Sequence, residues 1–277
     1  MTGFGSRLVS SVAARGSLCV GIDPHPGLLD QWGLPRDVSG LERFALTCVE
    51  ALAGEVSVLK PQSAFFEAYG SRGVAVLERV IADARSLGAL VLLDVKRGDI
   101  GSTMSAYAAA YLSDGSPLAA DAVTLSPYLG FGSLSPALDE AARTGRGVFV
   151  LARTSNPEGA SVQQARVDDR SVAQSVVDAA AEHNAGASPL GSVGLVIGAT
   201  VAEVDLDLSA LNGPILAPGV GAQGAGVEDL ARVFGSALPH VLPTSSRDIL
   251  RHGPDPASLR TAALTVRDTL AAIAGRP

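Results

Sequence analysis

The segment ALVLLDVKRGDIGSTMSAYAAAYLS, residues 89–113, contains the structural unit that repeats along this chain. It starts with a nearly continuous apolar run, which predicts a buried strand at Ala89–Lys96. Polar and glycine residues follow, and Ser102–Ser113 then predicts a helix. A buried strand that leads through a short loop into a helix is typical of parallel α/β proteins.

Seven other segments repeat this order. Together with Ala89–Lys96, this gives eight predicted strands. In chain order they are Leu18–Asp23, Val56–Lys60, Ala89–Lys96, Ala122–Ser126, Gly147–Ala152, Val193–Gly198, Pro214–Ala217 and His240–Pro243. The helices expected beside them are Gly40–Ala53, Ala64–Leu87, Ser102–Ser113, Ser133–Thr144, Asp168–His183, Thr200–Ser209, Gly226–Phe234 and Pro256–Ala274. One connection, Thr154–Ser192, is longer than a loop and helix require, and such insertions often form lids.

Eight strand–helix units in about 250 residues favour a (β/α)8 TIM barrel. A doubly wound open sheet is the alternative fold, but the loop after the first strand, Gly21–Pro26, lacks the Gly-rich dinucleotide fingerprint of that class. The sequence contains no linker, low-complexity tract or further repeat. We therefore expect residues 1–277 to form a single barrel domain.

Composition restricts the class of protein. Apolar residues make up 47% of the chain and charged residues 18%, as in soluble globular proteins. The net charge of −7 argues against a nucleic-acid binder. Two cysteines without a CxxC or Cys/His cluster predict neither a disulfide scaffold nor a metal site, and they fit a reducing cytoplasm. No signal-peptide core or membrane span is expected.

Polar residues are expected to converge where the strands end, because TIM barrels carry their chemistry at the carboxyl ends of the strands. Polar side chains lie at or just after the ends of six of the predicted strands. They are Asp23, Lys60, Asp94 with Lys96, Thr154 with Ser155, Gln223, and Arg247.

The third strand carries the most specific pattern. Only two of the 21 basic residues are lysines, and Lys96 lies close to Asp94 and Asp99. Asp94 and Lys96 are two residues apart on a strand, so both are expected to point into the barrel with backbones about 7 Å apart. Neighbouring carboxylates raise the pKa of a lysine and favour its protonated form. Lys96 is therefore expected to act as a proton donor. The alternative is a buried ion-pair network that only supports the barrel.

A phosphate site is expected after the seventh and eighth strands, where TIM barrels often bind phosphate. Gly219, Gly221 and Gly224 allow close backbone approach, Gln223 can donate an amide hydrogen bond, and Arg247 can bind two phosphate oxygens. Ordinary loop glycines and a surface arginine are the alternative.

These residues resemble a known family. The stretch DVKRGDIGST, residues 94–103, is similar to the DxKxxDI signature of the orotidine 5′-phosphate decarboxylase family, in the longer form of its bacterial type 2 branch. The resemblance covers nearly the whole chain. It extends through GIDP (21–24), KPQ (60–62), SPYLG (126–130), RTSNP (153–157), APGVGAQG (217–224) and SR (246–247).

The resemblance implies a carboxy-lyase that converts orotidine 5′-monophosphate to UMP and carbon dioxide, in the last step of de novo UMP synthesis. It also implies a homodimer with shared active sites and no metal or organic cofactor. Lys96 would protonate C6 within an array of alternating charge, and the remaining roles follow by position. The array would consist of Lys60, Asp94 and Lys96 of one chain together with Asp99 of the partner subunit. The ribose would contact Asp23, Lys60 and the partner subunit's Thr103. Ser155 would contact the pyrimidine, and Gln223 and Arg247 would contact the phosphate.

Two other functions stay open at this point. A Schiff-base aldolase on the same barrel would need a lysine with a lowered pKa, which carboxylates around Lys96 oppose. A non-enzymatic sensor of a phosphorylated ligand would leave the Asp–Lys–Asp cluster without a role.

Overall fold

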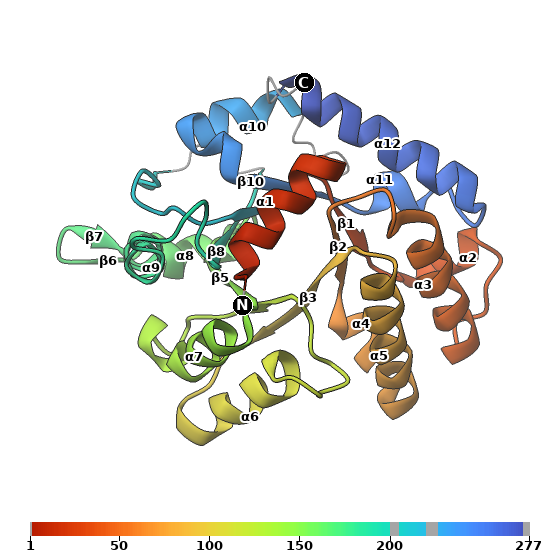
Figure 1. The fold of residues 1–277 in the computed structure, drawn as a ribbon, viewed down its shortest axis with the longest axis horizontal. Helices are drawn as coiled ribbons and strands as arrows, with labels where there is room; N and C mark the ends of the chain where they lie inside the picture. The colour runs from red at the N-terminus through yellow and green to blue at the C-terminus, as the bar shows by residue number, and fades with distance from the viewer. Residues whose placement is uncertain (1, 200–204, 220–226, 274–277) are drawn as a thin grey trace.

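The computed structural model describes residues 2–199, 205–219 and 227–273. Eight parallel strands close into one barrel in chain order, with β10 beside β1, which confirms the predicted (β/α)8 TIM barrel (Figure 1). Every predicted strand is present, and each end lies within two residues of its predicted position. The strands are β1 (Cys19–Ile22), β2 (Val58–Pro61), β3 (Leu90–Arg97), β4 (Ala122–Leu125), β5 (Gly147–Arg153), β8 (Val193–Ile197), β9 (Ile215–Pro218) and β10 (Val241–Ser245).

Helices surround the barrel, and two apolar layers stabilise it. Between the strands and the helices lies a large buried cluster, while a smaller cluster that includes Val58, Leu92, Phe149 and Leu216 fills the barrel itself. The helices that follow the strands are α2 (Pro26–Gln31), α3 (Val38–Leu52), α4 (Ser63–Glu67), α5 (Gly70–Ser86), α6 (Gly101–Leu112), α7 (Ser135–Thr144), α9 (Val172–His183), α10 (Val227–Phe234), α11 (Arg247–Leu250) and α12 (Pro256–Ile273).

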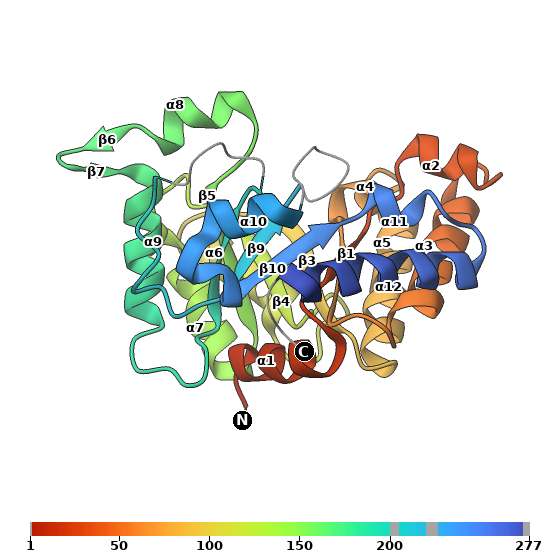
Figure 2. The same ribbon diagram turned by 90° about the horizontal axis from the view of Figure 1, so that it is seen from above.

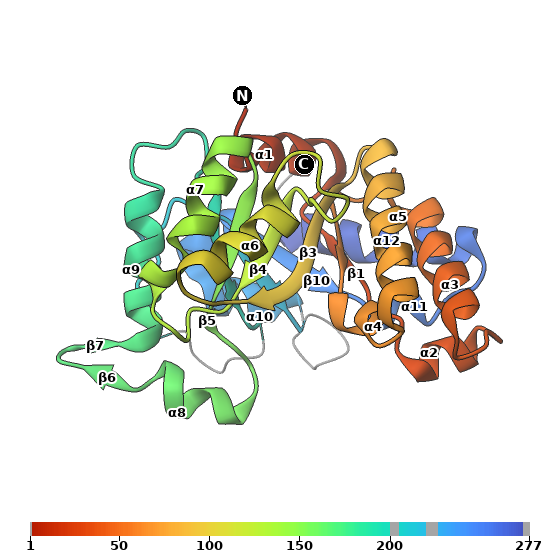
Figure 3. The same ribbon diagram turned by 90° about the horizontal axis from the view of Figure 1, so that it is seen from below.

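The amino end of the barrel is covered by α1 (Phe4–Arg15), a helix that the sequence analysis did not predict. Phe4 is fully buried and packs edge to face on Phe149, with ring centroids 5.9 Å apart. Arg7 donates to Asp121 at 2.5 Å, so the helix is also fixed by an ion pair. Figures 2 and 3 show α1 at the end of the barrel opposite α8 (Ala160–Gln163). The carboxyl ends of the strands, where the polar residues are expected to converge, lie at the end of the barrel opposite α1 (Figures 2 and 3).

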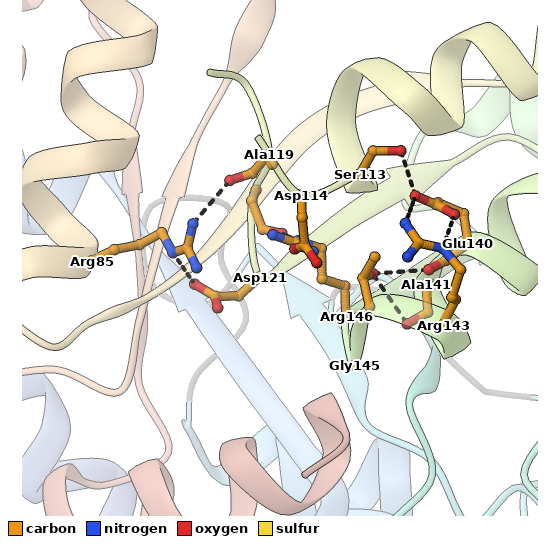
Figure 4. A network of polar contacts seen from close by, with 12 residues as sticks. Arg85, Ser113, Asp114, Ala119, Asp121, Glu140, Ala141, Arg143, Gly145 and Arg146 are labelled. Atoms are coloured by element: carbon orange, nitrogen blue, oxygen red, sulfur yellow. Dashed lines mark hydrogen bonds and ion pairs between the residues drawn. The ribbon is translucent and has the colours of Figure 1, made fainter. Parts of the chain in front are cut away.

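A second polar network supports the outer wall near the amino end (Figure 4). Arg85 reaches Asp121 at 3.6 Å, and Arg146 donates to Asp114 at 2.7 Å. Asp121 also accepts the backbone N–H of Val91 at 3.0 Å. These contacts tie α5, the start of β3 and the residue before β5 to the segment before β4, and none of these five residues lines the cavity described below.

Three predicted helices differ from the structure. Ala64–Leu87 is two helices, because Gly70 takes a left-handed φ of 65° between α4 and α5. The predicted helix Asp168–His183 begins in the turn of a short hairpin, between β6 (Arg166–Val167) and β7 (Arg170–Ser171), and α9 starts only after the cap at Ser171. Of the predicted helix Thr200–Ser209, residues 205–209 are not helical, and 200–204 lie outside the described residues.

The remaining elements are short 3-10 turns. They are η1 (Phe131–Leu134), η2 (Pro157–Gly159) and η3 (Gly235–His240), so the predicted helix Ser133–Thr144 starts inside a 3-10 turn. Among the described helices, none is long and apolar enough to cross a membrane.

Candidate active site

A cavity of about 280 Å³ opens at the carboxyl ends of the strands. Its walls contain six of the predicted site residues, which come from the loop after β1, from β2 and β3, from the loop after β5 and from the start of α11. These six are Asp23, Lys60, Asp94, Lys96, Ser155 and Arg247. Leu151, Val196 and Leu216 supply an apolar part of the wall. The structure therefore joins residues spread over more than 220 positions of the sequence.

Asp94 lies between two lysine ammonium groups. Lys60 Nζ donates to Asp94 Oδ2 at 3.3 Å, and Lys96 Nζ donates to Asp94 Oδ1 at 2.6 Å. Lys60 Nζ also lies 3.8 Å from Asp23 Oδ1. The charges thus alternate from Asp23 through Lys60 and Asp94 to Lys96.

Electrostatics fix the ionisation of the two buried members. Burial alone would lower the pKa of Lys60, but the charges of Asp23 and Asp94 outweigh it and hold that pKa above its ordinary value. Burial alone would raise the pKa of Asp94, yet the charges of Lys60 and Lys96 and two donated hydrogen bonds lower it to about 2. Asp94 is therefore ionised and Lys60 protonated at neutral pH.

Lys96 differs from Lys60 in its surroundings. The side chain of Lys60 is 6% exposed, whereas that of Lys96 is 45% exposed. Lys60 is therefore buried in the interior of the barrel. Lys96 lies at the cavity wall, where its ammonium can reach a bound molecule and where its removal would leave no buried void.

The inward direction of Lys96 has a different cause from the predicted strand alternation. The pairing of β3 with β4 shifts register between Leu93 and Arg97, and Lys96 takes a left-handed φ of 46°. Gly98 packs so closely against Ser126 that a Cβ at position 98 would lie 2.3 Å from the backbone oxygen of that serine. An irregular backbone, rather than a regular strand, thus sets the Asp94–Lys96 contact.

The loop after β5 separates the roles of two neighbouring hydroxyls. Thr154 Oγ1 donates to Asn156 Oδ1 at 2.6 Å and accepts from Gln163 Nε2 at 2.7 Å. Gln163 belongs to α8, within the connection that was predicted to be unusually long. Both Thr154 and Ser155 line the cavity, but the threonine hydroxyl is engaged within its own loop.

Three predicted residues are not part of this wall. Asp99 accepts the backbone N–H of Ile100 at 2.8 Å, and neither it nor Thr103 lines the cavity of the same chain. Thr103 is exposed on α6. Gln223 lies outside the described residues, as do Gly221 and Gly224, while Gly219 lines the cavity.

Sequence reasoning missed several wall residues. Gln62 and Thr124 were not selected, although Thr124 lies at the carboxyl end of β4 and strand position could have identified it. Ser246, which the resemblance includes only as a neighbour of Arg247, has a buried Oγ without a hydrogen-bond partner among the described residues. His25, which follows β1, also lines the cavity.

Comparisons with known proteins agree with this geometry. Residues 16–261 match the profile of the orotidine 5′-phosphate decarboxylase / HUMPS family. A protein of Salinispora arenicola named orotidine 5′-phosphate decarboxylase is 65% identical over 99% of this chain and 100% of its own length. One of Streptomyces coelicolor with the same name is 60% identical over 95% of each chain.

Solved structures give the same result. A crystal structure from Streptomyces avermitilis, provisionally assigned as orotidine 5′-phosphate decarboxylase, has a TM-score of 0.96 and 57% identity over 99% of this chain and 97% of its own. The OMP decarboxylase of Leishmania donovani has a TM-score of 0.76 and 30% identity over the full length of both chains. This chain therefore belongs to the orotidine 5′-phosphate decarboxylase / HUMPS family.

Proposed function

We propose that this chain converts orotidine 5′-monophosphate to UMP and carbon dioxide in the cytoplasm, as a single-domain enzyme without a metal or organic cofactor. The observation that carries the proposal is the ionised Asp94 held between the ammonium groups of Lys60 and Lys96 in one cavity. Relatives named orotidine 5′-phosphate decarboxylase match the chain at full length, which supports the same substrate.

The charge array fits the difficulty of this reaction. Loss of carbon dioxide from C6 leaves a carbanion without an adjacent carbonyl group to accept the electrons, so the site must stabilise the negative charge electrostatically. Asp94 lies near the departing carboxylate of the substrate, and the repulsion between the two negative charges destabilises the bound substrate. The Lys96 ammonium, which contacts Asp94, stabilises the negative charge that develops on C6. Lys96 then donates its proton to C6, so the C–C bond electrons end in a new C–H bond.

The remaining wall residues hold the substrate. Asp23 and Lys60 bind the ribose hydroxyls, and Arg247 binds the phosphate. The family resemblance assigns Gln223, which lies outside the described residues, to the phosphate as well. Ser155 contacts the pyrimidine. That choice over Thr154 is supported by the two hydrogen bonds that occupy the threonine hydroxyl.

A second copy of the chain completes the site through Asp99 and Thr103. Three large apolar side chains near these residues are exposed, and they make an apolar contact surface for the partner: Ile100 (62%), Tyr128 (79%) and Leu129 (53%). The loops after β3 and β4 lie side by side there, since Ser126 N–H donates to Arg97 O at 2.7 Å. Exposed apolar patches of this kind often mark protein interfaces.

A direct assay tests the proposed function. The purified chain should consume orotidine 5′-monophosphate and release UMP and carbon dioxide in equal amounts. Consumption of the substrate is monitored by the loss of its absorbance. Tight nucleotide binding without turnover would instead indicate a sensor. Borohydride trapping with a keto-sugar phosphate would indicate an aldolase, which the raised pKa of Lys60 disfavours.

Replacing Arg247 with Ala should lower kcat/KM for orotidine 5′-monophosphate about 100-fold, because a charge-assisted, two-pronged contact to the phosphate is lost. Turnover of the free nucleoside orotidine should change little. Arg251→Ala is the matched control, since this exposed arginine is one helical turn away and does not line the cavity. Equal losses for nucleotide and nucleoside would remove Arg247 from the phosphate site.

A further inference from the structure

One buried hydroxyl joins the backbone of Lys96 to the carboxylate of Asp94. Thr124, on β4, is 1% exposed. Its Oγ1 accepts the backbone N–H of Lys96 at 3.0 Å and donates to Asp94 Oδ1 at 2.7 Å. Lys96 Nζ donates to that same carboxylate oxygen at 2.6 Å. The contacts form a closed ring through the main chain of Lys96, its side chain, Asp94 and Thr124.

The irregular part of β3 explains why this hydroxyl is needed. Regular pairing with β4 stops after Leu93 and resumes at Arg97. Between them, the N–H of Lys96 donates to the Thr124 side chain rather than to a carbonyl of β4. A left-handed φ is unfavourable for a residue with a Cβ and persists only where its surroundings hold it. Lys96 has a φ of 46°, and the hydrogen bond from its N–H to Thr124 helps to hold this conformation.

The carboxylate depends on the same contact. Asp94 Oδ2 faces the buried ammonium of Lys60, whereas Oδ1 receives only Lys96 Nζ and Thr124 Oγ1 as hydrogen-bond donors among the described side chains. The Lys96 side chain is long and 45% exposed, so it cannot by itself fix the carboxylate plane. The short, buried threonine can.

We propose that Thr124 is a positioning residue that sets the Asp94 carboxylate and the Lys96 ammonium relative to each other. This inference rests on the proposed decarboxylation, and it adds a residue that acts through two others. The hydroxyl is needed for its two hydrogen bonds, and the methyl group of Thr124 is not. The role therefore predicts that serine can replace threonine and that valine, which has nearly the same shape, cannot.

The kinetic test compares Thr124→Val with Thr124→Ser. We expect Thr124→Val to lower kcat about 100-fold, because misplaced reacting groups slow the chemical step. KM should stay within about threefold, since the groups proposed to bind ribose and phosphate are unchanged. Thr124→Ser should keep kcat within about fivefold of wild type. Thr124→Ala, the second hydroxyl-free variant, should resemble Thr124→Val and serves if the valine disturbs folding.

The pH profile adds a readout that a merely structural role would not move. Lys60 and Lys96 face the Asp94 carboxylate, with Asp23 beyond Lys60, and all three groups stay in Thr124→Val. Loss of a donor to the charged form raises the pKa of Asp94. The acid limb of kcat should therefore move to higher pH in the valine and alanine variants and stay in place in the serine variant.

A crystal structure of each variant tests the ring without substrate, so its outcome is independent of the proposed function. In Thr124→Val, Lys96 Nζ should lie beyond about 4 Å from Asp94 Oδ1, outside ion-pair distance, and in Thr124→Ser the contact should persist. Normal kcat in the hydroxyl-free variants, equal losses in valine and serine variants, or an unchanged contact between Lys96 Nζ and Asp94 Oδ1 in Thr124→Val would each overturn the proposal.

Discussion

Replacing Lys96 with Ala is expected to lower kcat for orotidine 5′-monophosphate about 10⁵-fold while the barrel stays folded. The variant loses both the cation that stabilises the carbanion and the acid that protonates it, and each effect is worth several orders of magnitude. The Lys96 side chain is 45% exposed, so its truncation creates no buried cavity. Steady-state turnover and the far-UV circular dichroism spectrum of the same preparation measure the two expectations.

Lys96→Arg separates charge from proton donation. Arginine keeps a positive charge but does not release a proton at neutral pH, so this variant should also be severely impaired. Arg97→Lys is a useful companion, because it places a lysine next to the site without replacing Lys96. Near-normal turnover in Lys96→Ala would contradict the assignment of the proton donor.

Mixing two inactive variants should restore activity if the sites are shared between subunits. Asp94→Asn removes a charge from the cavity of its own chain, whereas Asp99→Asn removes one that we assign to the partner's cavity. Each variant alone should lose about 10³-fold in kcat. After random subunit exchange, half of the dimers are mixed and each has one intact site, so about one quarter of wild-type activity should return.

The control for this mixture is a pair of variants in the same cavity. Asp94 and Lys96 contact each other within one chain, so Asp94→Asn and Lys96→Ala each damage the cavity of the chain that carries the substitution. In that mixture every cavity contains one of the two defects, and no activity should return. Absence of recovery for Asp94→Asn with Asp99→Asn, despite exchange shown by native mass spectrometry, would count against shared sites.

The sequence was sufficient for the barrel and for most of its site. Each strand is a short apolar run whose identity depends on its own residues, and a closed parallel barrel brings all carboxyl ends to one face. Asp23, Lys60, Asp94, Ser155 and Arg247 therefore meet in one cavity, as predicted. The family signature supplied the expected roles.

Features that depend on distant neighbours needed the structure. Helix α1 is fixed by Phe149 and Asp121, which lie far along the chain. The engagement of Thr154 depends on Gln163 in a separate helix.

Strand order and the charges at strand ends were thus determined by the sequence alone, because both follow from local patterns of residues. The left-handed backbone of Lys96 and its ring with Thr124 and Asp94 were decided only by tertiary structure. A backbone conformation that is unfavourable in isolation is held in place by hydrogen bonds from a neighbouring strand, and no local pattern records such a contact.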